Sequence, residues 1–389
     1  MSLSKKMLLL IVSCLIIVGC GKEKNTEPTS STQPTNKEIK PVNLKVGHVG
    51  HDHHLPLFVA LDMAEKEPEK FCPKGITLKK EVDKKRYKLF KAGKKIADIE
   101  VLKVGGGSKM PTALAQGVID VGYGGTAPVL AAIDKGSPIK LISPLHSKGD
   151  MFVLSPDFPA KTWQEFIEFV KKSPKPIRIG YKNPIAVAKI IFENALKHEG
   201  IKFSSNITDS TATVHLVNVK GGGKLNTSLS NKIIDGYAGN NPFPAIGEEK
   251  KILKVICELE NLPPGNFKNH PCCCIAAVTN DIEEKAEVLN ILLAMNRAAV
   301  NLINNDLNSA AKIASRWIGT TETVEKNSIP TSGYSMSDDE QWHKTMSVWA
   351  DAMNKLGFFK NKLKDLPEKD FVNKAYDLSL LKKSQNDQK

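Results

Sequence analysis

Five polar residues lie close together near the start of the chain: His48, His51, Asp52, His53 and His54. Imidazole and carboxylate groups can contact a polar solute directly, and both also bind zinc, copper or nickel. Neighbouring side chains rarely all turn toward one ion. We therefore expect one or two of these residues to contact a solute, with loop packing and a metal site as the alternatives.

A second cluster of reactive residue types is His270-Pro271-Cys272-Cys273-Cys274. One interpretation is a strand whose alternating cysteines face the core as small apolar side chains. The alternatives are a disulfide through Cys272 or Cys273, and metal or redox chemistry. The cysteine spacings of the chain define no disulfide framework.

No catalytic motif accompanies these clusters. The sequence has no G-x-S-x-G, no paired carboxylate motif and no H-E-x-x-H. Lys109 and Lys224 follow glycines but lack the GK[ST] form of a phosphate-binding loop. We therefore predict that the protein is not an enzyme and carries no cofactor.

A glycine-rich stretch occurs twice, at residues 105–128 and 221–242. Asp120 and Asp235 are 235 − 120 = 115 residues apart, and Pro128 and Pro242 are 242 − 128 = 114 apart. Each copy predicts a turn with positive φ, a short helix, a strand and a small-residue turn. Two copies predict two similar lobes that share a cleft.

Each copy ends in a turn with a candidate capping group, Thr126 in the first and Asn240 in the second. Such turns present free backbone N–H groups to a ligand. We expect both turns to face the cleft.

The N-terminus predicts export and lipid attachment. Residues 1–19 combine Lys5-Lys6 with an apolar run from Met7 to Val18, as in a signal peptide. Residues 17–20, Ile-Val-Gly-Cys, resemble the bacterial lipobox, in which Cys20 carries the lipid. Residues 20–42 are rich in Ser, Thr, Pro and Lys and predict a flexible linker.

Composition is that of an ordinary globular protein, with 41% hydrophobic and 25% charged residues. The net charge of +13 becomes +11 without Lys5 and Lys6 (13 − 2 = 11). The basic residues form no dominant run, which argues against nucleic-acid binding. An anionic ligand or membrane surface fits better, and a solvated surface is an equal alternative.

The order of elements predicts an α/β protein. Residues 43–49 read as a strand, followed by a loop and a helix from Leu57 to Glu65. The same opening recurs at residues 177–199. We expect a first lobe at 43–145, a second lobe at 146–270, and a return to the first lobe at 271–389, helical after Ile282.

With these residues in hand, the chain resembles the extracytoplasmic substrate-binding proteins of ABC importers. It is most similar to the nitrate/sulfonate/bicarbonate group, which includes thiamine-pyrimidine binders. The resemblance rests on the lipobox, the opening at His48 to Ala60, and residues 112–142 and 178–201.

The resemblance implies a bilobed periplasmic-binding-protein type II fold, in which two lobes joined by two crossover strands hold a small polar or anionic solute. It implies a monomer that delivers the solute to a permease in the cytoplasmic membrane. Its ligand contacts fall on loops at strand ends. In this sequence these loops contain no arginine, and they contain His51, Asp52, His53, His54, Gly124, Gly125, Thr126, Tyr181, Asn183, Gly239, Asn240 and Asn241.

Fungal thiamine-pyrimidine synthases, distant relatives of this fold, carry an iron-associated cysteine-rich motif that Cys272–Cys274 matches in part. The alternatives to a receptor are therefore a metal-dependent pyrimidine-forming enzyme and a metal-capture lipoprotein. Aromatic residues beside the cleft loops either stack on a planar ligand or pack in the core; they are Phe58, Tyr123, Tyr181, Tyr237 and Phe243.

Overall fold

The computed structural model describes residues 40–106 and 108–386. The predicted signal peptide, Cys20 and residues 20–39 of the predicted linker lie outside the described residues. The first strand begins at Val42, the last residue of that linker. The described part belongs to one compact unit that starts at Lys40.

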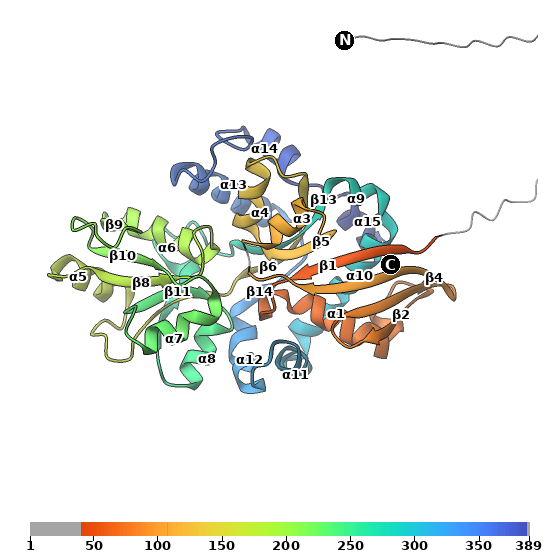
Figure 1. Cartoon of the computed structure of the whole chain (residues 1–389), viewed down its shortest axis with the longest axis horizontal. Coiled ribbons are helices and arrows are strands. Elements are labelled where there is room, and N and C mark those ends of the chain that lie inside the picture. The colour runs from red at the N-terminus through yellow and green to blue at the C-terminus, as the bar shows by residue number, and fades with distance from the viewer. Residues whose placement is uncertain (1–39, 107, 387–389) are drawn as a thin grey trace, which may run out of the picture. The chain divides into compact units, whose positions relative to one another are not determined.

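This unit is built on two mixed β-sheets with helices around them (Figure 1), which confirms the predicted α/β class. In spatial order, the first sheet consists of β14 (Ser332–Tyr334), β6 (Ile139–Lys148), β13 (Pro271–Val278), β5 (Val121–Gly125), β1 (Val42–His48), β4 (Lys94–Lys103), β3 (Arg86–Lys91) and β2 (Ile76–Val82). The second consists of β12 (Lys254–Glu258), β7 (Asp150–Leu154), β11 (Gly236–Asn240), β8 (Ile177–Tyr181), β10 (Val214–Asn218) and β9 (Phe203–Ser204).

The two sheets share one plan. A parallel trio lies at the centre of each, β4-β1-β5 in the first and β10-β8-β11 in the second. One strand that arrives from the other sheet then pairs antiparallel with the trio, β13 beside β5 and β7 beside β11. The chain leaves the first sheet between Lys148 and Asp150 and returns to it at Pro271.

The repeated stretches form equivalent elements. Gly106 and Gly221 both have positive φ, 126° and 134°, a conformation that favours glycine. Two short helices follow, α3 (Met110–Ala115) and α7 (Leu225–Ser230). These helices lead to β5 and β11, so the predicted structural repetition is confirmed.

The repeated aspartates, Asp120 and Asp235, make the same kind of hydrogen bond in each sheet. The Asp120 carboxylate accepts the backbone N–H of Lys45 in β1 at 2.7 Å. Asp235 accepts the N–H of Arg178 in β8 at 2.8 Å. Each therefore ties the start of a repeated strand to the strand beside it.

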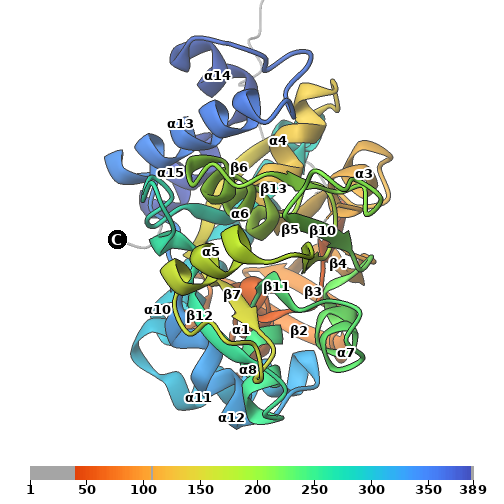
Figure 2. The same ribbon diagram turned by 90° about the vertical axis from the view of Figure 1, so that its left-hand side faces the viewer.

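Helices cover both sheets. Near the first sheet, α3 and α4 (Thr126–Asp134) lie on one side, and α1 (Leu55–Lys66) and α11 (Leu307–Ile318) on the other (Figure 1). Figure 2 shows α5 (Trp163–Lys172) and α6 (Val187–His198) together over the second sheet, with α7 and α8 (Phe243–Glu249) beside β11. The remaining helices are α2 (Pro68–Phe71), α9 (Thr279–Glu284), α10 (Ala286–Asn305), α12 (Glu322–Ser328), α13 (Glu340–Lys355), α14 (Glu368–Ala375) and α15 (Ser379–Asn386).

One of these helices, α10, is long and apolar enough to cross a membrane by length and composition alone. Two-thirds of its apolar window is buried inside the protein. Leu289, Leu292 and Met295 belong to the hydrophobic core. We therefore describe α10 as a core helix.

Three local expectations need correction. Thr126 and Asn240 do not cap helices: the N-cap of α4 is Gly125 and that of α8 is Pro242, and neither makes a side-chain cap. In the second opening, at residues 177–199, the helix begins only at Val187, after a turn in which the Ala186 N–H donates to the Asn183 carbonyl. The region after Ile282 also contains a strand, β14, whose three residues pair with β6, because sheet pairing there overrides weak local propensity.

Candidate functional site

A cleft of about 660 Å³ lies where loops from both sheets meet. The carboxyl ends of parallel strands share one edge of a sheet, and the loops after β1, β4, β8 and β10 all reach this cleft. The glycine turns that begin both repeated stretches line it, whereas Thr126 and Asn240, whose turns we expected to face the cleft, do not. The lining residues are Val49, Gly50, His51, Lys103, Val104, Gly105, Gly106, Ser108, Lys109, Lys182, Asn183, Pro184, Asn218, Lys220, Gly221, Gly222, Gly223, Pro242, Phe243, Ile246, Ile318, Gly319 and Thr320.

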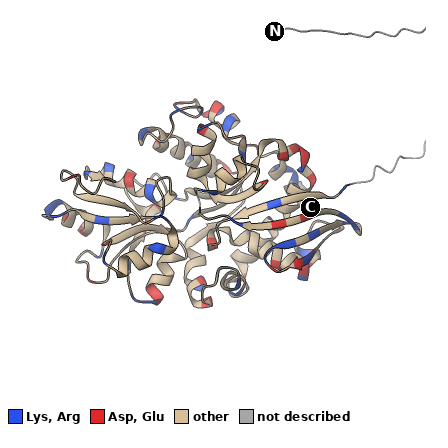
Figure 3. Ribbon diagram, in the orientation of Figure 1, with Lys and Arg blue, Asp and Glu red and all other residues tan. Residues whose placement is uncertain are grey.

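The cleft is cationic. Four lysines line it, and among the described lining residues there is no Asp, Glu or Arg. Lysine ammonium groups are positively charged at neutral pH, so the lysines together favour an anion. They are Lys103, Lys109, Lys182 and Lys220. Elsewhere acidic and basic residues are interspersed over the elements (Figure 3).

Two of these lysines are positioned by specific neighbours. The Lys182 ammonium donates to the Oδ1 of Asn240 at 2.5 Å, which joins the ends of β8 and β11. Lys103 lies against Gly50, where an added Cβ would come within 2.6 Å of the lysine Cε. Gly50 also has a φ of 84°, so the close approach of Lys103 depends on glycine there.

Several predicted residues border the cleft. His51 and Asn183 line it directly. A neighbouring cavity of about 20 Å³ is lined by His51, His53, Gly125 and Asn183 together with Cys272 and Cys273. The predicted histidine cluster and cysteine cluster therefore meet at the inner end of the cleft.

Other predicted residues are buried without lining either cavity. The Asp52 carboxylate accepts a hydrogen bond from Ser328, and burial raises its pKa. His54 Nδ1 accepts the backbone N–H of Val49 at 3.0 Å, and burial lowers its pKa. Tyr181 packs in the core. Gly124, Thr126 and Gly239 lie in or beside β5 and β11 and line neither cavity.

Asn240 and Asn241 do not line the cleft, but their side chains form hydrogen bonds with residues around it. Asn240 accepts from Lys182, as described above. The Asn241 amide donates to the Ser328 carbonyl at 3.1 Å and to Thr331 Oγ1 at 2.6 Å. Asn241 thereby joins the end of β11 to the segment that follows α12.

Four side chains form a compact buried group: His53, His146, Cys272 and Cys273. One ligand-type atom from each lies within 4.8 Å of all the others. His53 Nδ1 is 3.5 Å from Cys272 Sγ and 3.8 Å from Cys273 Sγ. These residue types can hold a metal ion.

The protonation of this group is unusual. Burial alone would raise the pKa of the Cys273 thiol, but a hydrogen bond from Cys272 and the electrostatic effect of nearby His146 lower it. Burial lowers the pKa of His146, yet the Cys273 sulfur raises it. The five cysteines that the structure describes are all free, so the alternative of a disulfide through Cys272 or Cys273 does not hold here.

Sequence reasoning missed two sets of residues. It considered the ends of β1, β5, β8 and β11 but not those of β4 and β10, which supply Lys103 and Lys220. The parallel order of the strands would have pointed to them. His146 could not be found in this way, because its place beside Cys273 depends on the pairing of β6 with β13.

Of the five aromatic residues considered for stacking on a ligand, four pack in the core and one lines the cleft. Phe58, Tyr123, Tyr181 and Tyr237 are buried in the core. Phe243 lines the cleft and is available to stack on a planar group.

Three solved structures have a similar fold. A ligand-binding component of an ABC-type import system from Staphylococcus aureus, with zinc bound, has a TM-score of 0.66, with 15% identity, 88% of this chain and 98% of that chain covered. The nitrate-binding protein NrtA from Synechocystis PCC 6803 has a TM-score of 0.64, with 13% identity and 89% of each chain covered. The alkanesulfonate-binding protein SsuA from Xanthomonas axonopodis pv. citri, bound to MOPS, has a TM-score of 0.60 and 13% identity. The match covers 83% of this chain and 96% of that chain.

These likenesses confirm the bilobed periplasmic-binding-protein fold.

A curated relative, the uncharacterized protein MJ1180 from Methanocaldococcus jannaschii, is 38% identical over 141 residues, which are 36% of this chain and 86% of the relative. The model of the NMT1-like family matches residues 37–319. The chain belongs to the NMT1-like family.

Proposed function

We propose that this protein is an extracytoplasmic solute receptor of an ABC importer. It binds a small organic anion between two lobes and delivers the anion to the permease. The observation that carries this proposal is the cleft lined by loops from both sheets, with four lysines and no carboxylate among its described lining residues.

The charge and size of the cleft narrow the class of solute. Several ammonium groups around one cavity attract an anion, and the attraction is stronger there than in open water. A volume of about 660 Å³ falls in the range of pockets for organic ligands and exceeds what nitrate needs. Phe243, Ile246 and Ile318 add apolar lining. A sulfonate or phosphate ester with an apolar part fits this combination.

The similar structures support the same class. One is described as nitrate-binding and another as alkanesulfonate-binding. In both, the solute is an oxyanion. In this chain lysines and glycine-rich backbone take the place of an arginine fork, since backbone N–H groups at a glycine-rich turn also bind anions.

Closure of two lobes would enclose the solute. We assign residues 43–145 and 271–389 to one lobe and 146–270 to the other. The connection near Gly149, which has a φ of 79°, and the segment before β13 are the proposed hinges. A solute that contacts both lobes favours the closed state by its extra contacts there.

Lipid attachment at Cys20 is the second part of the proposal. The lipobox-like residues 17–20 and the polar tract after them support it. When the full chain is produced in a bacterium with lipoprotein processing, we expect it in the membrane fraction. The Cys20→Ser variant should lose lipid by mass spectrometry; a lipid-free wild-type chain would contradict the anchor.

One observation favours a second candidate, a metal-dependent enzyme: His51, His53, Cys272 and Cys273 border the cavity beside the cleft. Isothermal titration calorimetry with an anion that binds, followed by mass spectrometry of the recovered solute, distinguishes a receptor from an enzyme. A receptor binds one solute per chain and returns it unchanged. Conversion of the solute over hours would establish the enzyme instead.

A further inference from the structure

We propose that His53, His146, Cys272 and Cys273 hold one resident zinc ion in a closed tetrahedral site at the inner end of the cleft. This inference goes beyond solute binding and does not depend on the identity of the solute. It rests on the spacing of the four side chains, on the hydrogen bonds that orient them, and on a buried nitrogen without a partner.

The spacing is that of a tetrahedron around zinc. Zn–S bonds of about 2.3 Å and Zn–N bonds of about 2.0–2.1 Å place neighbouring ligand atoms about 3.4–3.8 Å apart. His53 Nδ1 lies 3.5 Å from Cys272 Sγ and 3.8 Å from Cys273 Sγ. All four ligand atoms lie within 4.8 Å of one another, so small side-chain adjustments complete the site.

Hydrogen bonds leave the correct nitrogen free on each histidine. His53 Nε2 lies 3.1 Å from the Gly149 carbonyl, to which it donates, and its Nδ1 therefore faces the sulfurs as a lone pair. His146 Nδ1 lies 3.1 Å from the Ser147 carbonyl. Its Nε2 is buried with no hydrogen-bond partner. Histidine ligands of zinc commonly use one nitrogen for the metal and donate the other N–H to a carbonyl.

Gly149 makes the first of these arrangements possible. A Cβ on residue 149 would lie 2.9 Å from His53 Nε2 and 2.5 Å from Ser332 Oγ. Any larger residue would push the imidazole away from the carbonyl. The glycine that connects the two sheets therefore also sets the orientation of a proposed metal ligand.

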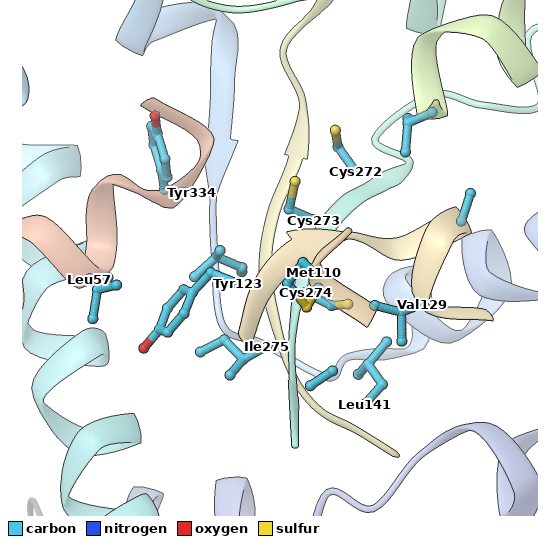
Figure 4. Close-up of a cluster of buried hydrophobic side chains, with 14 of the residues drawn as sticks. Leu57, Met110, Tyr123, Val129, Leu141, Cys272, Cys273, Cys274, Ile275 and Tyr334 are labelled. Carbon is cyan, nitrogen blue, oxygen red and sulfur yellow. The ribbon is translucent and has the colours of Figure 1, made fainter. Parts of the chain in front are cut away.

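The sheet itself brings the ligands together. Cys273 in β13 is the register partner of His146 in β6. The register of β13 on β6 shifts on both sides of Cys273, and such irregularities break the alternation of side chains. Figure 4 shows the result: Cys274 lies among Met110 and Val129, while Cys272 and Cys273 point away from that group.

The charges also balance. Zinc displaces one proton from each of the two thiols, so Zn²⁺ with two thiolates and two neutral imidazoles has no net charge. A neutral group avoids the cost of a buried charge. Asp150 and His270 form the next layer: in the metal-free chain Asp150 Oδ2 accepts the Cys272 thiol proton at 3.1 Å, the proton that zinc would displace, and Asp150 Oδ2 also lies 3.4 Å from His270 Nε2.

Burial favours a resident ion over a transported one. The four ligands are 1–4% exposed, and four protein ligands leave no open position on the metal. The ion would join the loop after β1 to the two strands, β6 and β13, at which the chain leaves and re-enters the first sheet. It would stiffen the floor of the cleft while the lobes move.

Elemental analysis of the purified full chain, prepared with a thiol-free reductant and zinc and then dialysed, tests the site. We expect one zinc per chain. The paired variant C272S/C273S and the variant His146→Asn should lose it, while C72S/C257S, which removes two cysteines outside the site, should retain it. Circular dichroism checks that each variant folds.

A second measurement needs no variant. Cobalt(II) added to the metal-free chain should give tetrahedral and thiolate-to-cobalt absorption that saturates at one equivalent. Absence of zinc, zinc content unchanged in the site variants, an octahedral cobalt spectrum, or a Cys272–Cys273 disulfide that persists under reductant would each overturn the proposal. Solute binding that survives zinc loss would leave the receptor function intact.

Discussion

Gly106 and Gly221 occupy equivalent positions 221 − 106 = 115 residues apart, and their φ angles are 126° and 134°. Each begins the turn that leads from a central parallel strand into a short helix, and each lines the same cleft. A conformation reserved for glycine is thus used twice, once in each half of the cleft.

The first prediction concerns these glycines. Gly106→Ala and Gly221→Ala meet no atom within 4 Å, yet both are strained because of their φ angles. We expect each of these two substitutions to lower the free energy of unfolding by about 1–3 kcal/mol. Urea denaturation measures this change. Gly223→Ala also meets no atom within 4 Å and has no positive φ. It is the matched control and should change stability by much less.

The second prediction concerns the charge of the cleft. Lys182→Gln and Lys220→Gln should each weaken binding of an organic anion about ten- to hundred-fold, because charge-assisted hydrogen bonds contribute about 1.5–3 kcal/mol. Titration calorimetry at two salt concentrations measures this effect, and wild-type affinity should fall as salt rises. Lys79 is an exposed residue of β2 outside the cleft, and Lys79→Gln should bind like wild type. Equal losses in all three variants would show that the lysines act non-specifically.

The third prediction is a pH dependence. Burial, and then the nearby Asp52 carboxylate, raise the pKa of Glu325 to about 8. The folded state keeps this proton above the usual glutamate pKa of 4.5. Its contribution to stability is therefore complete below about pH 4.5 and is lost as pH rises toward 8, by at most about 1.4 kcal/mol per pH unit.

Glu325→Gln should remove this loss, because the amide cannot ionise. Urea denaturation at pH 5, 6.5 and 8 measures the slope. Glu322→Gln, on the exposed side of α12, is the control and should keep the wild-type slope. A Glu325→Gln variant with that same slope would show that Glu325 is ionised in the folded protein.

The fourth prediction tests the repeated aspartates. Asp120→Ala and Asp235→Ala each leave a strand N–H without its acceptor. We expect each to destabilise the protein by about 1–3 kcal/mol, by urea denaturation. Asp351→Ala removes only a surface ion pair with Lys355 and should cost less than about 1 kcal/mol. Unequal effects of the two site variants would argue against equivalent roles.

Local sequence signals predicted much of the fold. Positive-φ glycines, alternating strands and short helices repeat in residues 105–128 and 221–242, and these signals depend only on near neighbours. Thr162, for example, directly precedes α5 and caps it, because its hydroxyl accepts the Glu165 N–H at 3.2 Å.

The composition of the site depended on distant pairing and was predicted less well. Alternation placed Cys272 and Cys274 on one side of a strand, but the irregular register of β13 turns Cys272 and Cys273 together. His146 joins them from a strand more than a hundred residues earlier in the sequence. No local sequence pattern predicts the register in which β6 pairs with β13.

A thermal-shift screen that pairs each organic anion with its neutral analogue tests the central claim most directly. Sulfonates and phosphate esters are compared with the matching alcohols, on the full chain and on a Lys182→Gln/Lys220→Gln variant. We predict that at least one anion raises the melting temperature with dose, that its neutral analogue does not, and that the variant loses the response. Stabilisation by neutral solutes alone, or an anion response that is unchanged in the variant, would contradict a receptor for anions.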